Sequence, residues 1–106
     1  MMDEHAILNT VAAAFHLTPE IIKSKKRSQR VAYVRQIAMY LIRENTKLST
    51  VEIGIFLNRD HSTVIHGWKI IAMRVAGDRA FLWTIGQIRA SVTSKEQWSH
   101  RWGMQA

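Results

Sequence analysis

The residues with the greatest capacity for chemistry lie in one unbroken run, residues 59–66, which reads RDHSTVIH. Side chains of these types donate and accept hydrogen bonds at the edges of DNA bases, and the cationic ones also bind phosphate. The run contains the residue types of a hydrolase as well, but Asp60, His61 and Ser62 are adjacent. Adjacent side chains cannot point at one another as a nucleophile and its base must. We therefore expect recognition rather than an enzyme, with no catalytic residue.

Metal and nucleotide chemistry are not expected either. His61 and His66 fall outside the i, i+4 spacing of a helical zinc pair, and the sequence has no cysteine. Its five glycines are scattered, and none precedes a Lys-Ser or Lys-Thr pair as in a phosphate-binding loop. We expect no metal, no cofactor and no bound nucleotide.

Two consecutive helices are predicted around the run. The first opens with a capping box, in which Ser49 caps and Glu52 reaches back. The second begins near Asp60, and its period separates two faces. The apolar face consists of Val64, Trp68, Ile71 and Val75. The face of hydrogen-bond donors consists of Arg59, Ser62, Thr63, His66 and Lys69. This pattern is typical of the recognition helix of a helix-turn-helix, although an ordinary amphipathic surface helix also fits it.

Composition favours a small basic domain that binds a polyanion. The 106 residues suit one domain, and 47% apolar residues suffice for one modest core. The formal net charge of +7 favours nucleic acid or an anionic membrane surface as partner. No apolar run approaches the ~20 residues of a membrane span, and the acidic start at Asp3 does not fit a signal peptide. We expect a cytoplasmic, nucleoid-associated protein with no membrane partner.

Helical patterns cover the N-terminal half. Residues 4–16 form one predicted helix, and Thr18 caps a short second one that begins with Pro19. A third begins near Val34 and runs to about Asn45.

The C-terminal half continues in the same way. The long helix should end near Gly77, with Asp78 capping the next. Ser94 could cap a further short turn over residues 95–101. The stripe of the helix that precedes this turn consists of Phe81, Leu82, Ile85, Ile88 and Val92. The fold class is therefore all-α, with about five to six helices.

Residues 23–35 form a basic segment with six cations and no acid. The cations are Lys23, Lys25, Lys26, Arg27, Arg30 and Arg35. A solvated loop is the ordinary interpretation of such a run. Beside a helix-turn-helix, however, basic arms commonly enter the minor groove.

The sequences of these motifs resemble the C-terminal DNA-binding domain of the bacterial replication initiator DnaA. The resemblance rests on residues 59–66, on Ile53 and Gly54, on residues 35–41 (RQIAMYL) and on residues 25–28 (KKRS), in the family's order. It covers residues 5–92 and implies a Trp-repressor-like helix-turn-helix domain over residues 1–92. The tail, residues 93–106, lies outside it.

We expect the start of the recognition helix to read a short, asymmetric, A·T-rich box in double-stranded DNA, as the resemblance implies. The residues expected at base edges are Arg59, Asp60, His61, Ser62 and Thr63, with Arg27 in the minor groove. The residues expected on phosphates are Lys25, Ser28, Arg35, Gln36, Arg43, Thr46, Thr50, His66 and Lys69. Arginine suits guanine, aspartate accepts from the cytosine amino group, and a threonine methyl packs on a thymine methyl. Asp60 could alternatively serve only as the helix cap.

Three positions depart from the family pattern. A single Asn58 stands where the family usually has two glycines or a similar pair, and asparagine tolerates the left-handed conformation of a tight turn. The shorter turn is expected to change the orientation of the recognition helix. Ile70 stands where the family often has a basic residue, which removes one phosphate contact. Gly54 lies mid-helix, and close approach of two helices would explain a residue that costs ~1 kcal/mol there.

The expected function is sequence-specific binding to a DnaA-box-like site, in replication initiation or its regulation. Full-length family members also carry a nucleotide-binding module that is not represented here, and the starting methionines and Trp-rich tail favour a self-contained protein. A transcriptional regulator could use the same fold, and so could a protein-interaction adaptor that has lost base reading. The intact run and the basic segment argue against the adaptor. Trp98 and Trp102 in the tail are expected to pack on the domain, with a protein partner or self-association as the alternative.

Overall fold

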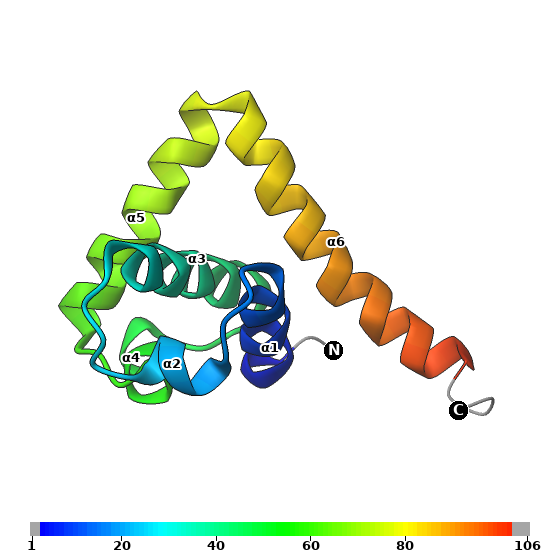
Figure 1. Ribbon diagram of the computed structural model, residues 1–106, viewed down its shortest axis with the longest axis horizontal. Helices are drawn as coiled ribbons and strands as arrows, with labels where there is room; N and C mark the ends of the chain where they lie inside the picture. The colour runs from blue at the N-terminus through cyan, green and yellow to red at the C-terminus, as the bar shows by residue number, and fades with distance from the viewer. Residues whose placement is uncertain (1–2, 103–106) are drawn as a thin grey trace.

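The helices pack around a central third helix. The computed structural model describes residues 3–102, with side chains described for residues 3–92, and this part of the chain contains helices and no strand (Figure 1). The helices are α1 (Glu4–Ala14), α2 (Pro19–Lys23), α3 (Gln29–Asn45), α4 (Thr50–Leu57), α5 (His61–Gly77) and α6 (Arg79–Trp102). The predicted all-α class is confirmed.

Four helices begin at the caps predicted for them. In each case a side-chain oxygen accepts a hydrogen bond from the backbone amide three residues further on, which satisfies a donor that the helix leaves unpaired. These caps are Thr18 for α2, Ser49 for α4, Asp60 for α5 and Asp78 for α6. Ser49 completes the capping box, because its own amide donates to Glu52 Oε1 at 2.9 Å.

Two predicted boundaries were wrong. α3 begins at Gln29 rather than near Val34, because Ser28 Oγ accepts from the Val31 amide at 3.1 Å and caps the helix. Residues 29–34 are therefore helix and not loop. The predicted cap at Ser94 is not a boundary either, since α6 continues without a break to Trp102. The interpretation of Trp98 and Trp102 lies outside the described side chains.

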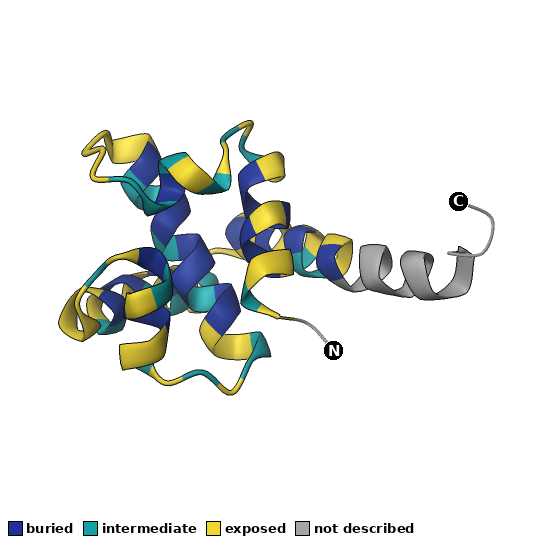
Figure 2. Ribbon diagram, turned by 90° about the horizontal axis from the view of Figure 1, so that it is seen from below, coloured by how far each residue is buried: buried dark blue, intermediate teal, exposed yellow. Residues whose placement is uncertain are grey.

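α3 runs through the middle of the domain, in contact with α1, α2, α4 and α5, while α6 packs on α1 and α5. Figure 2 shows the buried residues on the inward faces of these helices. The core combines residues from every helix, among them Val11, Ile22, Ile37, Leu41, Ile53, Leu57, Val64, Ile71 and Ile85. The predicted stripe of α6 is buried except for Leu82, which is 47% exposed.

No helix within residues 3–102 is both long enough and apolar enough to cross a membrane.

Candidate nucleic-acid interface

The backbone conformation of Asn58 and a hydrogen bond to Gly54 make the turn between α4 and α5 tight. Asn58 adopts the left-handed conformation (φ 59°, ψ 45°), as its residue type allowed us to expect. The Arg59 amide then donates to the Gly54 carbonyl at 2.8 Å. A Cβ on Gly54 would collide with the Arg59 carbonyl oxygen. The glycine is therefore required by the backbone of the turn and not, as we predicted, by the approach of another helix.

The first turn of α5 exposes its polar side chains to solvent. Asp60 Oδ1 accepts from the Thr63 amide at 2.8 Å and from Ser62 Oγ at 3.0 Å. Hydrogen bonds from the Thr63 side chain and amide, and then from the Ser62 hydroxyl, lower the pKa of the Asp60 carboxyl. His61, Ser62 and Thr63 are all exposed. The cap therefore stays ionised at neutral pH, and three exposed polar side chains lie at the helix start.

Further along α5 the two predicted faces are present. Val64 and Ile71 are fully buried, and Trp68 and Val75 are partly buried against the core. His66 and Lys69 are exposed on the outer side. Gly67 allows α3 to approach closely, since a Cβ there would meet Gln36 Cγ at 3.2 Å and also the Met39 sulfur. The helix is thus anchored along one side and open along the other.

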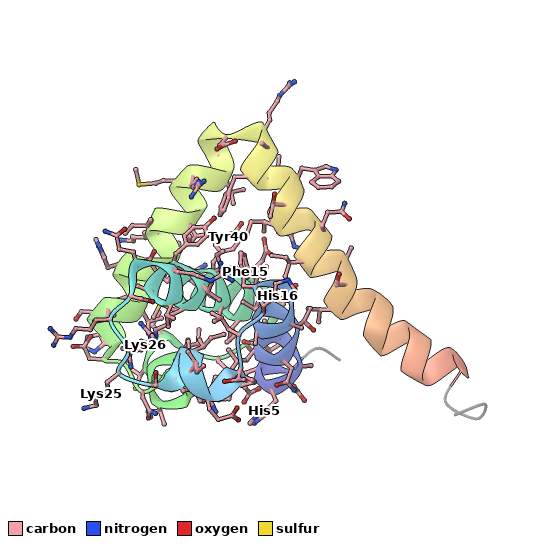
Figure 3. All side chains as sticks on the ribbon, in the orientation of Figure 1. His5, Phe15, His16, Lys25, Lys26 and Tyr40 are labelled. Atoms are coloured by element: carbon pink, nitrogen blue, oxygen red, sulfur yellow. The ribbon has the colours of Figure 1, made fainter. Side chains whose placement is uncertain are left out.

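The loop between α2 and α3 carries the exposed cations. Lys25, Lys26 and Arg27 are exposed, and Figure 3 shows the first two projecting from the loop into solvent. The loop lies at the same edge of the molecule as the start of α5 (Figure 1). Ser28 follows as the α3 cap; its oxygen accepts from the chain, and its hydroxyl proton remains able to donate to a phosphate.

Arg35 has a different position from the one expected of a phosphate ligand. It is only 6% exposed, because its side chain lies against α2 and the loop that follows α2. Its Nε donates to the Ile22 carbonyl at 2.7 Å, and its Nη2 donates to the carbonyls of Ser24 at 3.1 Å and Lys26 at 3.3 Å. Burial, and then the nearby charge of Arg59, lower the pKa of the Arg35 guanidinium. Its role is to hold the loop.

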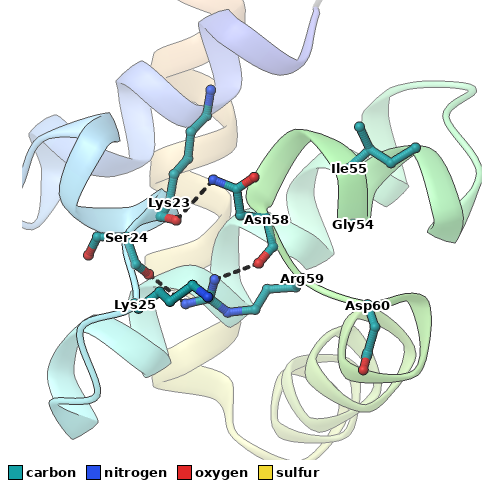
Figure 4. Close-up of a pocket in the computed structure, with 8 residues that line it drawn as sticks. All are labelled: Lys23, Ser24, Lys25, Gly54, Ile55, Asn58, Arg59 and Asp60. Carbon is teal, nitrogen blue, oxygen red and sulfur yellow. Dashed lines mark hydrogen bonds between the residues drawn. The ribbon is translucent and has the colours of Figure 1, made fainter.

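Arg59 is half-buried, and its guanidinium contacts the loop. Its Nη2 donates to the Ser24 carbonyl at 2.6 Å, and its Nη1 donates to the Asn58 carbonyl at 2.7 Å (Figure 4). In this arrangement both terminal nitrogens of the guanidinium donate to carbonyls within the chain. Sequence reasoning missed this connection because the two residues that it joins are far apart in the chain.

The remaining residues expected on phosphates lie on α3 and α4. Arg43 is exposed and stacks on Trp68, with its guanidinium carbon 3.7 Å from the ring centroid. Thr50 is the first residue of α4 and is partly exposed. Thr46 caps the end of α3, and its hydroxyl donates to the Ile42 carbonyl at 2.7 Å. Because that proton is already used, Thr46 is poorly suited to donate to a phosphate.

Trp68, predicted only as a core residue, also has a contact with the outer side of α3. Its ring supports Arg43 on one side, and the Lys69 ammonium lies 6.0 Å from its centroid. Its indole Nε1 is buried without a hydrogen-bond partner in the described structure. The spacing of Arg43 and Trp68 in the sequence gives no sign of this pairing, because it arises from the packing of α3 on α5.

The geometry described above defines a helix-turn-helix domain, with a capped, polar recognition helix beside a basic loop. The family model described as the bacterial dnaA protein helix-turn-helix matches residues 5–71 of this chain. The chain belongs to that family, which confirms the resemblance.

Individual relatives agree with the family assignment. The chain is 37% identical over 91 residues to the chromosomal replication initiator protein DnaA of Deinococcus radiodurans, covering 86% of this chain and 20% of that protein. It is 42% identical over 98 residues to the protein of the same name from Clavibacter sepedonicus, covering 92% and 20%. For Treponema pallidum the identity is 55% over 62 residues, covering 58% and 13%. The chain thus spans about a fifth or less of the length of these relatives.

Proposed function

We propose that this chain binds double-stranded DNA sequence-specifically, at a box of the kind bound by the replication initiator family, in replication initiation or its regulation. The observation that carries the proposal is the first turn of α5. There His61, Ser62 and Thr63 are exposed beside the ionised cap Asp60, on a helix whose opposite side is buried. The N-terminal residues of such a helix are those that reach base edges in the major groove.

The polar groups at this helix start match distinct features of base pairs. The Thr63 methyl can pack on a thymine methyl. The Ser62 hydroxyl, whose proton is donated to Asp60 Oδ1, can accept a hydrogen bond from a base amino group. His61 adds a ring nitrogen that donates or accepts. The Asp60 carboxylate can accept from a cytosine amino group while it remains the helix cap, because an ionised carboxylate has further lone pairs beside those that accept from Ser62 and Thr63.

Phosphate contacts around this centre would fix the orientation of the domain. The exposed cations of the basic loop and α5 supply charge, and the N-terminus of α3 offers backbone amides with the hydroxyl of Ser28. The residues that we assign to phosphates are Lys25, Ser28, Gln36, Arg43, Thr50, His66 and Lys69. Arg27 is exposed in the same loop and is assigned to the minor groove, where arginine is attracted by the potential of narrow A·T tracts. Arg35 and Thr46 are left out, because their donors are used within the chain.

The biological role follows from the relatives and is part of the proposal. They are named as chromosomal replication initiators, and the chain matches about a fifth or less of each. A domain of this kind recognises the DNA site. It would bring a domain or protein attached to it to the box, or would occupy the box by itself.

The test begins with selection of a preferred duplex from a random library, without assumption about its sequence. Affinity for the selected box and for its scrambled version is then measured by fluorescence anisotropy at several salt concentrations. We expect a preference of at least about a thousandfold, as for other specific DNA-binding domains. Release of about six counterions would give a slope of log affinity on log salt near roughly −5. Equal affinity for both duplexes would remove the proposed function.

A further inference from the structure

The segment that joins α2 to α3 is held in place at its backbone by a buried side chain. Arg35 donates hydrogen bonds to two of its carbonyls, those of Ser24 and Lys26, and to the carbonyl of Ile22 in α2. In addition, the Lys26 amide donates to Ser24 Oγ at 3.2 Å. The loop therefore has a defined course before it reaches the exposed Arg27.

The turn of the helix-turn-helix holds the same segment from the other side. Asn58 Nδ2 donates to the Lys23 carbonyl at 3.4 Å, and Arg59 Nη2 donates to the Ser24 carbonyl (Figure 4). The Ser24 carbonyl thus accepts from two guanidinium groups, one on α3 and one from the turn. Asn58 and Ser24 are far apart in the sequence and lie near each other only in the folded chain.

We propose that Asn58 and Arg59 are positioning residues that fasten the arginine-bearing loop to the start of the recognition helix, so that minor-groove reading by Arg27 depends on the side chains of the turn. This inference rests on the proposed DNA binding and deepens it. Arg59 acts through the loop backbone and not by contact with a base. Reading of the two grooves is then coupled, because one rigid connection sets the distance between Arg27 and the first turn of α5.

The electrostatics of the loop support a role in which DNA stabilises the connection. A depression in the surface is lined by Lys25, Lys26, Arg27, Ala32, Arg35, Asn58 and Arg59, and these described lining residues include no acid. Arg35 and Arg59 repel each other there, as the lowered pKa of Arg35 indicates. A phosphate backbone laid across the depression would offset that repulsion. DNA binding and the link between turn and loop therefore favour each other.

The experiment is a double-mutant cycle on the full chain with the selected box. The loss of affinity caused by Arg27→Ala is measured in the wild-type background and in Arg59→Ala, Arg59→Lys and Asn58→Ala backgrounds. Independent residues give the same loss in every background. We expect about a tenfold loss in the wild type and less than about threefold when Arg59 is alanine or lysine. Lysine retains the charge but lacks the planar, fixed set of donors with which the guanidinium reaches two carbonyls. Lys69→Ala, which likewise removes one cation but leaves the loop contacts intact, is the matched background in which the full loss should persist.

A second DNA probe isolates minor-groove reading. Replacement of adenines in the box by 2,6-diaminopurine adds an amino group in the minor groove and leaves the adenine pattern in the major groove. The wild type should discriminate against the modified box about as strongly as Arg27→Ala weakens binding. Arg59→Ala should bind both boxes with nearly the same affinity.

A measurement on the free protein makes the inference independent of DNA. Backbone ¹⁵N relaxation should show lower order parameters at residues 25–27 in Arg59→Ala than in the wild type, with α5 unchanged. Thermal unfolding of each variant shows whether it remains folded. If Arg59→Ala does not fold, the same measurements are made on Arg59→Lys.

The outcomes separate the two proposals. Absence of sequence preference in the wild type would overturn the proposed function and this inference together. Sequence-specific binding in which Arg27→Ala costs the same in every background would overturn only the inference. So would relaxed preference at a single base pair in Arg59→Ala with the Arg27 loss intact, since Arg59 would then be reading a base. Unchanged order parameters in the loop would overturn it without any DNA.

Discussion

The guanidinium carbon of Arg43 lies 3.7 Å from the centroid of the Trp68 ring. This contact joins the outer side of α3 to α5, and it holds a long cationic side chain in one orientation without neutralising it. Arginine loses side-chain entropy when it binds a phosphate, and a stacked arginine has lost part of it already.

Arg43→Ala should therefore lower affinity for the selected box and for scrambled DNA by the same factor. The slope of log affinity on log salt should become shallower by about 1. Trp68→Leu should reduce affinity in the same uniform way but leave the salt slope nearly unchanged, because the charge remains. Arg79→Ala is the control, since Arg79 is an exposed arginine at the corner between α5 and α6. A change in the ratio of specific to non-specific affinity in Arg43→Ala would show that Arg43 contacts a base.

His61→Ala and Thr63→Ala should sharply lower the ratio of specific to non-specific affinity. Loss of a base contact is expected to cost roughly 1–3 kcal/mol on the preferred box and little on unrelated DNA. Lys69→Ala, on the same exposed side of α5, should weaken both duplexes alike. Competition binding at fixed salt measures all three. If the His61 and Thr63 variants remain folded but lose both affinities equally, the helix start is not reading bases and a protein-interaction role becomes the better hypothesis.

Stability should depend on pH through the Asp60 cap. The folded pKa of this carboxyl lies below its unfolded value, so the unfolded chain takes up the proton first as the pH falls. The stabilisation is fully present above the unfolded pKa of ~3.9 and is lost as the pH falls through the folded value. Asp60→Asn keeps a good cap but removes the titrating group. Its melting temperature should consequently fall less than that of the wild type between about pH 6 and about pH 3. If the melting temperatures of the two proteins fall equally with pH, the Asp60 carboxylate does not contribute to the pH dependence of stability.

The same substitution at two glycines should have opposite effects. Gly54→Ala would drive a methyl group into the Arg59 carbonyl and open the turn, which should destabilise the domain by more than ~1 kcal/mol. Gly86 lies inside α6 with open space around its Cβ position, so Gly86→Ala should stabilise by about 0.5–1 kcal/mol. Denaturant unfolding measures both changes in the free energy of unfolding, provided that its dependence on denaturant concentration is the same in the variants and the wild type. A neutral Gly54→Ala would mean that the turn can relax.

The parts of the fold that sequence reasoning anticipated are those decided locally. Thr18, Ser49, Asp60 and Asp78 each cap a helix through an amide three residues away, so residue type and spacing suffice. The left-handed conformation of Asn58 is equally local.

The start of α3 was missed although a signal was present. Val31 and Val34 are three residues apart and both buried, which continues the apolar face of the helix. The cations among and around them favoured the interpretation as a loop. Ser94 was taken for a cap because serine often is one, but neither proline nor glycine interrupts the chain there and α6 continues.

The positions of Arg35 and Arg59 could not have been deduced from the sequence. Their partners are backbone carbonyls, which every residue possesses, and these carbonyls come near only when α2, α3 and the turn are packed together. A resemblance assigned both arginines to DNA. The folded chain gives them internal acceptors.

The choice of carbonyls as acceptors has a kinetic consequence. Carboxylates in their place would have held the loop equally well, but each would have cancelled a positive charge. Because neutral oxygens hold Arg35 and Arg59, the free domain retains its full basic potential at that edge. Such a potential accelerates the encounter with a polyanion, so the association rate constant should exceed that of an unsteered pair and decline steeply as ionic strength rises. How rapidly the domain finds a duplex should thus be governed by the salt in its surroundings, while the shape it presents on arrival is already fixed.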